Sequence, residues 1–339
     1  MTRHSVHVAW LLLVLACCRP AASDTAVWLR MEDESLWKSS LPVSGKPVLL
    51  YGHKAGSRLA VSADGRSVAA DSVPDGEAVL IFDTRQPGAR RTIPLSIGAE
   101  WFLGTWAPDG CGVLASKISS GMEGTYLGTY RIGLDGRRML VARPPCSGLG
   151  WAIDAQYSPS GQLLAIQGDD WLHVIRLSPK SETVLFKEGI DNSFGAPVWL
   201  GEDRLAIAGR ERLLLADVKK RTVKPWMTYE RVSYPVVYSK SLSKLFIVMQ
   251  LPADDGLVLH SVDAVSGKVQ AVDLDGLDTV LRIFGVTSDG KTALVCARAS
   301  SPKGSTESKP VPVGLWTVNL DTGKSTLVAD TAAIATIMP

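Results

Sequence analysis

Four stretches of this 339-residue chain follow one pattern: Val61-Ser62-Ala63-Asp64-Gly65, Trp106-Ala107-Pro108-Asp109-Gly110, Tyr157-Ser158-Pro159-Ser160-Gly161 and Val286-Thr287-Ser288-Asp289-Gly290. In each stretch an apolar run leads into a turn that ends in glycine, and a second apolar run follows. The turn glycines are 45, 51 and 129 residues apart. Two weaker copies, at 199–207 and 238–247, divide the longest gap into ordinary repeats. A recurrence of about 40 to 50 residues is typical of propellers and other repeat arrays.

Each repeat carries the signature of a β-hairpin. Two antiparallel strands joined by a short loop need a residue with positive φ near the turn, and glycine adopts that conformation without steric penalty. Asp or Ser in the turn bonds its own backbone. A third apolar stretch follows each hairpin, as at Ala78–Asp83 and Trp171–Ile175, and a fourth short stretch closes the unit. Four short strands per repeat, without long amphipathic helices between them, predict the blades of an all-β propeller.

Six full units are predicted, and both ends of the chain hold remnants of a seventh. The units lie near residues 58–95, 100–142, 149–187, 194–229, 232–274 and 279–329. The N-terminal remnant Leu36–Lys46 parallels Leu315–Lys324 with one residue inserted, so we expect it to form outer strands. Ile334–Ile337 is long enough for one inner strand. Pairing the two remnants leaves no open edge, which predicts seven four-stranded antiparallel blades. Six blades, with the N-terminal hairpin packed outside, is the alternative.

The first 23 residues have the pattern of a secretory signal peptide. Arg3 precedes the apolar run Val8–Cys18, and Ala21-Ala22-Ser23 supplies the small residues of a cleavage site before Asp24. The apolar run is too short to span a bilayer as a helix. We therefore expect residues 24–339 to form one exported propeller domain, periplasmic or extracellular.

Among the cysteines, Cys17 is the one with a predicted modification, which is lipidation. Val14-Leu15-Ala16-Cys17 resembles a bacterial lipobox, so lipidation of Cys17 is an alternative to ordinary cleavage. Cys111 and Cys146 flank one unit, but propeller geometry places them at opposite ends of the blade, which disfavours a bridge between them. Cys296 falls inside a strand and is expected to be a small core residue. No Cys or His spacing typical of a metal site occurs.

Charge and composition favour a soluble globular domain after the signal peptide. The chain has 36 basic and 34 acidic side chains, and removal of Arg3 and Arg19 with the signal leaves 34 of each. A neutral chain without basic blocks argues against nucleic acid as a partner, because such binding rests on neutralising phosphates. No later segment is apolar enough to span a membrane.

The sequence does not predict a catalytic centre. No G-x-S-x-G motif occurs, and His173 and His260 fall inside third strands, where packing on a strand face is expected. The sequence shows no clustered acidic or histidine partner for these two, and His53 is the third histidine after the signal peptide. Several acidic residues lie in loops between second and third strands, on one face of a propeller: Asp169, Asp170, Glu211, Asp254 and Asp255. A divalent metal on these carboxylates would make a lactonase-like site, and no other cofactor is predicted.

The best-preserved repeat, Ser158–Ala165, reads Ser-Pro-Ser-Gly-Gln-Leu-Leu-Ala. Together with the third strand and Gly-Lys turn that complete the units, it resembles the WD40-like (PD40) repeat of the TolB-type periplasmic propellers, over nearly all of residues 27–338. The resemblance implies a propeller fold. The same repeat occurs in Tol-system proteins, peptidase propeller domains and solitary exported proteins. TolB also carries an α/β domain before its propeller, whereas about four residues separate Asp24 from the first expected strand in this chain.

The leading functional hypothesis is an exported, non-catalytic propeller that binds a protein or peptide partner in the bacterial cell envelope. A propeller presents side chains from every blade on two loop faces and around a central channel. Four tryptophans near loop ends are candidates for an exposed aromatic binding face, with core packing as the competing interpretation: Trp101, Trp151, Trp171 and Trp226. The alternative function is a metal-dependent, lactonase-like propeller enzyme that uses Asp169, Asp170, Asp254 and Asp255.

Overall fold

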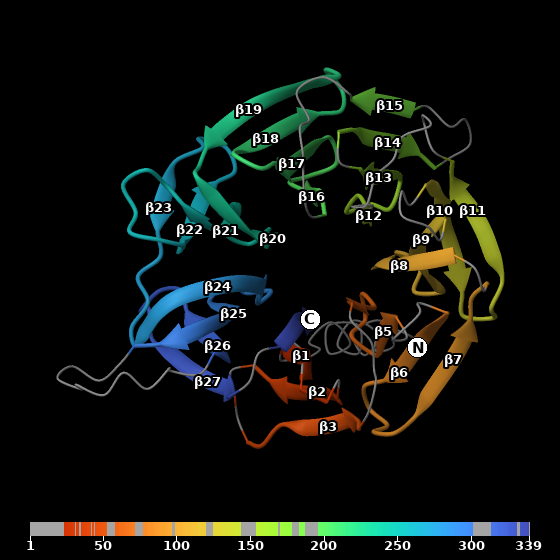
Figure 1. Cartoon of the computed structure of the whole chain (residues 1–339), viewed down its shortest axis with the longest axis horizontal. Coiled ribbons are helices and arrows are strands. Elements are labelled where there is room, and N and C mark those ends of the chain that lie inside the picture. The colour runs from red at the N-terminus through yellow and green to blue at the C-terminus, as the bar shows by residue number, and fades with distance from the viewer. Residues whose placement is uncertain are drawn as a thin grey trace, which may run out of the picture.

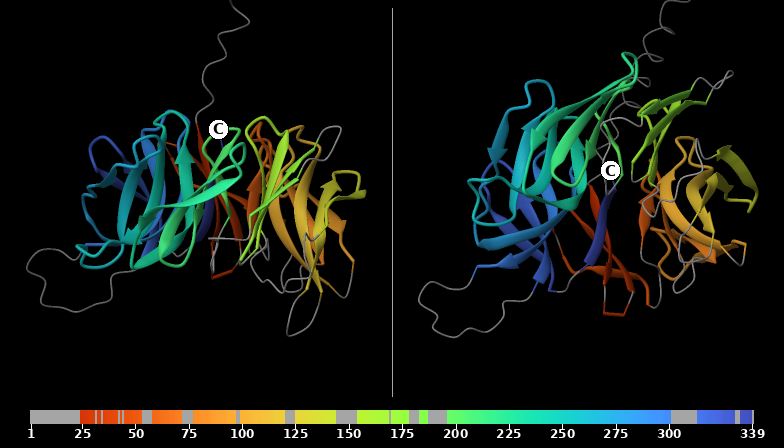
Figure 2. Two further views of the ribbon diagram at one scale, coloured as in Figure 1. Left: turned by 90° about the horizontal axis from the view of Figure 1, so that it is seen from above. Right: turned by 45° about the horizontal axis from the view of Figure 1, so that its top comes forward.

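The computed structural model describes residues 24–338, apart from 31, 34, 42, 44, 53–57, 72–76, 97–98, 120–124, 144–153, 169, 178–182, 187–195, 301–312 and 331–332. Within these residues the strands form seven four-stranded antiparallel sheets, arranged as blades in a ring (Figure 1). Seen from the side, the ring is a disc (Figure 2). The prediction of seven blades is confirmed, and the six-bladed alternative is wrong.

We call the blades A to G and name the strands of each blade from the centre outward. Blade A contains β28 (Ala333–Met338), β1 (Thr25–Arg30), β2 (Ser35–Ser40) and β3 (Val48–Tyr51); blade B contains β4 (Leu59–Val61), β5 (Ser67–Asp71), β6 (Ala78–Asp83) and β7 (Arg90–Pro94). Blade C contains β8 (Ala99–Trp106), β9 (Gly112–Ser119), β10 (Tyr126–Gly133) and β11 (Arg138–Ala142); blade D contains β12 (Asp154–Tyr157), β13 (Leu163–Gln167), β14 (Leu172–Arg176) and β15 (Thr183–Phe186). Blade E contains β16 (Val198–Trp199), β17 (Arg204–Ala208), β18 (Arg212–Asp217) and β19 (Thr222–Thr228); blade F contains β20 (Arg231–Ser239), β21 (Lys244–Gln250), β22 (Val258–Asp263) and β23 (Val269–Ala271). Blade G contains β24 (Leu277–Val286), β25 (Thr292–Ala299), β26 (Val313–Asn319) and β27 (Ser325–Ala329).

Blade A joins the two ends of the described chain. β28 pairs antiparallel with β1, with Trp28 opposite Ala335, and β2 pairs with the other edge of β1. Beside this blade, the Asp24 carboxylate accepts hydrogen bonds from the backbone nitrogen of Ser288 at 2.7 Å and from its hydroxyl at 3.1 Å. Ser288 lies in the turn between β24 and β25, so these bonds join blade A to blade G. The expected closure of the ring by both termini is confirmed.

The core of the disc lies between the blades. Each of the seven interfaces between neighbouring blades holds one apolar cluster, such as the one between blades F and G around Val248, Ile283 and Val295. Second strands pack on both faces, which explains why all five residues of β13 are buried. Strands buried on both faces need continuous rather than alternating apolar sequence, as the second run of each repeat shows.

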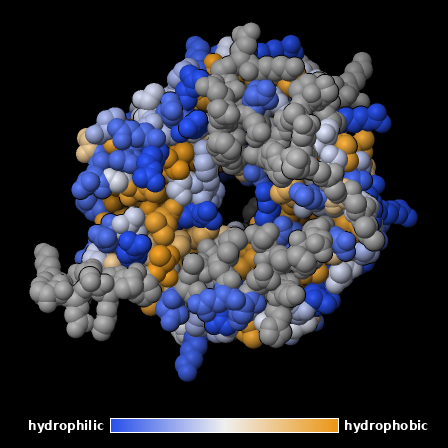
Figure 3. Space-filling model, viewed as in Figure 1, coloured by the Kyte–Doolittle hydropathy of each residue, from blue (hydrophilic) through white to orange (hydrophobic). Residues whose placement is uncertain are grey.

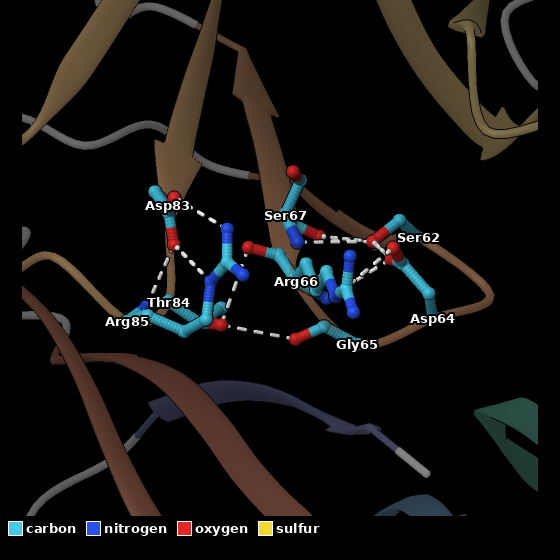
Figure 4. Close-up of polar contacts among 8 residues, drawn as sticks. All are labelled: Ser62, Asp64, Gly65, Arg66, Ser67, Asp83, Thr84 and Arg85. Carbon is cyan, nitrogen blue, oxygen red and sulfur yellow. Dashed lines mark hydrogen bonds and ion pairs between the residues drawn. The ribbon is translucent and has the colours of Figure 1, made fainter.

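The repeated turn is held by hydrogen bonds within the hairpin (Figure 4). In blade B the Ser62 hydroxyl donates to the Asp64 carboxylate at 2.7 Å, and it accepts from the Ser67 nitrogen at 2.9 Å. The hydrogen bond from Ser62 is the main cause that lowers the pKa of Asp64. The Thr84 hydroxyl, at the end of β6, donates to the carbonyl of Gly65 at 3.0 Å and so ties the turn to the third strand.

The turns also contact one another across blade boundaries. Gly161 has a φ of +73°, and an added Cβ would lie 2.5 Å from Cγ of Pro108 in the turn of blade C. The nitrogen and hydroxyl of Ser160 donate to the Glu202 carboxylate in blade E at 2.8 and 2.6 Å. The turn of blade D is therefore packed against one neighbour and hydrogen-bonded to the other.

We predict that Gly161→Ala destabilises the protein more than Gly88→Ala. Both glycines have positive φ, but nothing lies within 4 Å of an added Cβ at Gly88. Gly88→Ala therefore incurs only the cost of the left-handed conformation, about 1 to 2 kcal/mol, and Gly161→Ala adds about 1 to 3 kcal/mol for the collision with Pro108. Urea unfolding measures both, with Gly201→Ala as a nearly neutral control. Equal losses for Gly161→Ala and Gly88→Ala would contradict the contact between turns.

Candidate binding site in the central channel

The inner strands surround a channel with a volume of about 610 Å³. Its opening is visible at the centre of the space-filling view (Figure 3). Every blade contributes to its wall, and one residue from each blade, in the order A to G, illustrates this: Thr336, Arg58, Thr105, Asp154, Ala196, Tyr234 and Arg282. The channel therefore combines side chains that are far apart in the sequence.

A bulge shapes the wall of the channel in blade F. The pairing of β20 with β21 shifts register between Ser233 and Val237, and the extra residues include Tyr234 and Pro235, both of which line the channel. Pro235 has no amide hydrogen, so it is tolerated where the ladder is interrupted. The Tyr234 hydroxyl donates to the carbonyl of Gly209 at 3.1 Å, which fixes the side chain against blade E.

Arg58 links three blades at the edge of the channel. Its backbone nitrogen, just before β4, donates to the Asp71 carboxylate at 2.7 Å. Its guanidinium lies over the ring of Phe102 in blade C, 4.7 Å from the centroid, and its Nη1 is 3.3 Å from Oδ1 of Asp154 in blade D. A cation over an aromatic face and a carboxylate at hydrogen-bond distance together hold the guanidinium in one orientation.

Burial raises the pKa of Asp154, and the neighbouring Arg58 opposes that rise. The side chain of Asp154 is 25% exposed and that of Arg58 is 35% exposed, so the pair lies at a partly screened position. Desolvation favours the neutral form of the Asp154 carboxyl group, whereas the charge and hydrogen bond of Arg58 favour the ionised form.

Arg282 is the second guanidinium of the channel wall. It lies on β24 where the pairing with β25 shifts register, and its side chain is exposed. In the part of the chain that the structure describes, no hydrogen bond or ion pair engages this guanidinium. Among the described lining residues the charged groups are Arg58, Asp154 and Arg282. These described groups sum to one positive charge when Asp154 is ionised.

We predict that Arg58→Met raises the pKa of Asp154 further. The substitution keeps an apolar stem near Phe102 but removes the cation and the hydrogen bond that favour the ionised carboxylate. A carbon-13 NMR titration of the carboxyl groups, with the Asp154 signal assigned by its loss in Asp154→Asn, measures the change. Arg282→Met is the control and should leave the pKa of Asp154 nearly unchanged. A pKa that stays constant in Arg58→Met would contradict the described ion pair.

Two of the four tryptophans predicted to form an exposed aromatic face are buried. Trp101 is 5% exposed and packs on Tyr130, with 5.4 Å between ring centroids, and Trp171 is 4% exposed beside Tyr126. Both belong to clusters between blades, so core packing is the correct interpretation for these two. Trp226 is half-buried and packs against the cluster between blades E and F. Trp151 lies outside the described residues.

The acidic loop residues do not converge on a metal site in the described part of the chain. No group of three or more His, Cys, Asp or Glu residues suited to a metal is found among the described residues. Asp170, Asp255 and Glu211 are exposed, and Asp169 lies outside the described residues. Asp254 accepts from the backbone nitrogen of Leu251 at 2.8 Å.

The histidines and cysteines are mostly packed as expected. His260 is buried on its strand, and its Nε2 lies 3.4 Å from Oδ2 of Asp254, a contact that was not visible in the sequence. The contact depends on the fold of the loop between β21 and β22. His173 is buried, which lowers its pKa. Cys296 is buried as predicted, and Cys111 has an exposed free thiol. His53 and Cys146 lie outside the described residues.

The channel residues were not recognised from the sequence. Arg58 precedes a three-residue strand, and Asp154 and Arg282 stand singly in ordinary strand patterns. A signal was nevertheless present, because each is a charged residue in the first strand of a repeat or directly before it.

In the described residues, no helix is long and apolar enough to cross a membrane.

The comparisons with known proteins support the fold. No protein-family model matches the sequence, and no curated protein matches it. The structure is similar to that of TolB from Acinetobacter baumannii, with 14% sequence identity and a TM-score of 0.55, over 98% of this chain and 70% of that one. It is also similar to a proposed 6-phosphogluconolactonase from Bacteroides fragilis, with 15% identity and a TM-score of 0.62, over 94% of this chain and 99% of that one.

A third similar structure is a puromycin hydrolase, with 12% identity and a TM-score of 0.64. The match covers 91% of this chain and 52% of the hydrolase. The likeness is one of fold. At such identities a shared propeller says nothing of a shared reaction, because unrelated functions are built on one fold.

Proposed function

We propose that this protein is an exported, non-catalytic propeller that binds a protein or peptide partner in the bacterial cell envelope, and that the central channel receives a short segment of that partner. The observation that carries the proposal is the wall of the channel, to which all seven blades contribute polar and apolar side chains. A volume of about 610 Å³ suits a few residues of a peptide rather than a folded domain.

The rigidity of the wall supports binding. Each inner strand is paired along one edge, and the second strands behind them are buried between blades. Arg58 is held by contacts to Phe102 and Asp154, and the Tyr234 hydroxyl is hydrogen-bonded to blade E. A site whose polar groups are already oriented loses little entropy when a ligand binds.

Export is part of the proposal because of the N-terminal sequence. Arg3, the apolar run Val8–Cys18 and the small residues at 21–23 have the order of a signal peptide. The resemblance of the repeats to those of TolB-type propellers is consistent with the cell envelope, where a propeller would meet other envelope proteins. Lipidation at Cys17 would anchor the same domain to a membrane.

We predict that the protein purified from a bacterial envelope fraction begins at Asp24. Intact mass spectrometry measures this, because removal of 23 residues gives one defined mass. A chain that begins at a lipid-modified Cys17 would support the anchored form. Recovery of the uncleaved chain from the cytoplasm would contradict export.

We predict that a photo-crosslinking amino acid in the channel captures the partner. Para-benzoylphenylalanine at Thr105, on the channel wall, should give discrete adducts in living bacteria, and the same group at Met139 should not. Met139 is the matched control because it lies in the same blade and is 58% exposed on the outer strand β11. Adducts from Met139 alone would contradict binding in the channel.

A second measurement distinguishes binding from the metal-dependent alternative. Thermal unfolding is followed with and without Ca²⁺, Mg²⁺, Zn²⁺ and a chelator, since a ligand bound only by the folded state raises the unfolding temperature. A metal-dependent rise that is lost in Asp254→Asn would favour a carboxylate metal site and a hydrolase. An unchanged unfolding temperature, together with adducts at Thr105, would support the binding propeller.

A further inference from the structure

We infer that the segment received by the channel carries a carboxylate and that Arg282 is the residue that binds it. This inference rests on the proposed function, since it names the chemistry of the partner at the same site. It is carried by the charges on the described wall of the channel, which are two guanidiniums and one carboxylate.

The availability of Arg282 is the first step. Its guanidinium has five donors and takes no hydrogen bond or ion pair within the described residues, although it borders a cavity of about 610 Å³. Its backbone position is fixed, because the carbonyl of the preceding Leu281 accepts from the Ser233 hydroxyl and the following Ile283 is fully buried. Arg282 therefore has a fixed backbone, free guanidinium donors and a place on the cavity wall. A guanidinium of this kind can bind a planar anion through two parallel hydrogen bonds.

Arg58 contributes differently from Arg282. Its charge is largely balanced by Asp154, and the ring of Phe102 restrains its orientation. A ligand carboxylate near this pair is therefore attracted by the Arg58 guanidinium and repelled by the Asp154 carboxylate. Among the charged groups of the described wall, the strongest attraction for an anion is accordingly expected at Arg282.

A carboxylate fits better than a phosphate chain. The chain without its signal peptide has equal numbers of basic and acidic side chains, so it lacks the broad positive field of a nucleic-acid-binding protein. A single available guanidinium in a narrow channel suits one carboxylate of a peptide. That group is either an Asp or Glu side chain or the carboxyl terminus of the partner.

The test uses two mixtures of random synthetic heptapeptides, one with free and one with amidated carboxyl termini. Peptides retained by the immobilised protein are identified by mass spectrometry. We expect one of two results for the wild-type protein. Either peptides that contain Asp or Glu are enriched from both mixtures, or peptides are retained from the mixture with free carboxyl termini and not from the amidated mixture. The first result assigns the carboxylate to a side chain and the second to the terminus, and both support the inference.

Matched variants connect the retention to Arg282. Arg282→Gln should weaken the binding of a retained acidic peptide about tenfold, as expected for loss of one charge-assisted pair. Arg91→Gln, which removes one positive charge from the exposed outer strand β7, should bind like the wild type. Arg282→Lys keeps the charge without the planar fork and should fall between the two. Circular dichroism and thermal unfolding verify that each variant is folded.

The outcomes separate the inference from the proposed function. Thr105→Trp places a bulky ring in the channel and should abolish retention if peptides enter it. If Thr105→Trp abolishes retention but peptides are retained equally from both mixtures without enrichment of Asp or Glu, the inference is overturned and the binding function stands. The same holds if Arg282→Gln binds as tightly as Arg91→Gln. If no peptide is retained in a manner that depends on Thr105, the proposed function itself fails.

Discussion

Every blade of this protein depends on burial between neighbours. A four-stranded blade presents two apolar faces, and the second strands, such as β13 and β17, are buried almost completely on both. A blade at the end of an open row would expose one apolar face to water. The antiparallel pairing of β28 with β1 removes that end, and the bonds between Asp24 and Ser288 join the last blade to the first. Closure of the ring therefore allows every blade to bury both of its apolar faces.

The channel follows from closure. Seven inner strands arranged around an axis leave a space that their side chains do not fill, and the wall takes one or more residues from each blade. Arg58, Asp154 and Arg282 come from blades B, D and G and lie on this one surface. The fold places few constraints on which side chains line such a site, since each blade needs only to form an inner strand at that position. Its chemistry is free to vary while the packing between blades stays the same.

The turns and the channel are stabilised by different means. Turn residues such as Ser62 and Asp64 form hydrogen bonds with each other and with the same hairpin. Their role can therefore be recognised from a few consecutive residues of the sequence. Arg58 is instead held by Phe102 from the next blade and Asp154 from the one after it. The same contrast explains the tryptophans: Trp101 and Trp171 stand near loop ends in the sequence, yet both are buried by neighbouring strands.

The sequence by itself determined the all-β repeat, the seven blades and their closure by both termini. Those features depend on short-range signals, such as the turn glycines and the length of Ile334–Ile337, which act within one hairpin or one strand. Only the tertiary structure decided which charged residues share the channel, that His260 contacts Asp254, and that Trp101 is buried. These outcomes depend on contacts between strands and blades that pair residues across long separations, and the repeat pattern carries no information about which side chains meet there.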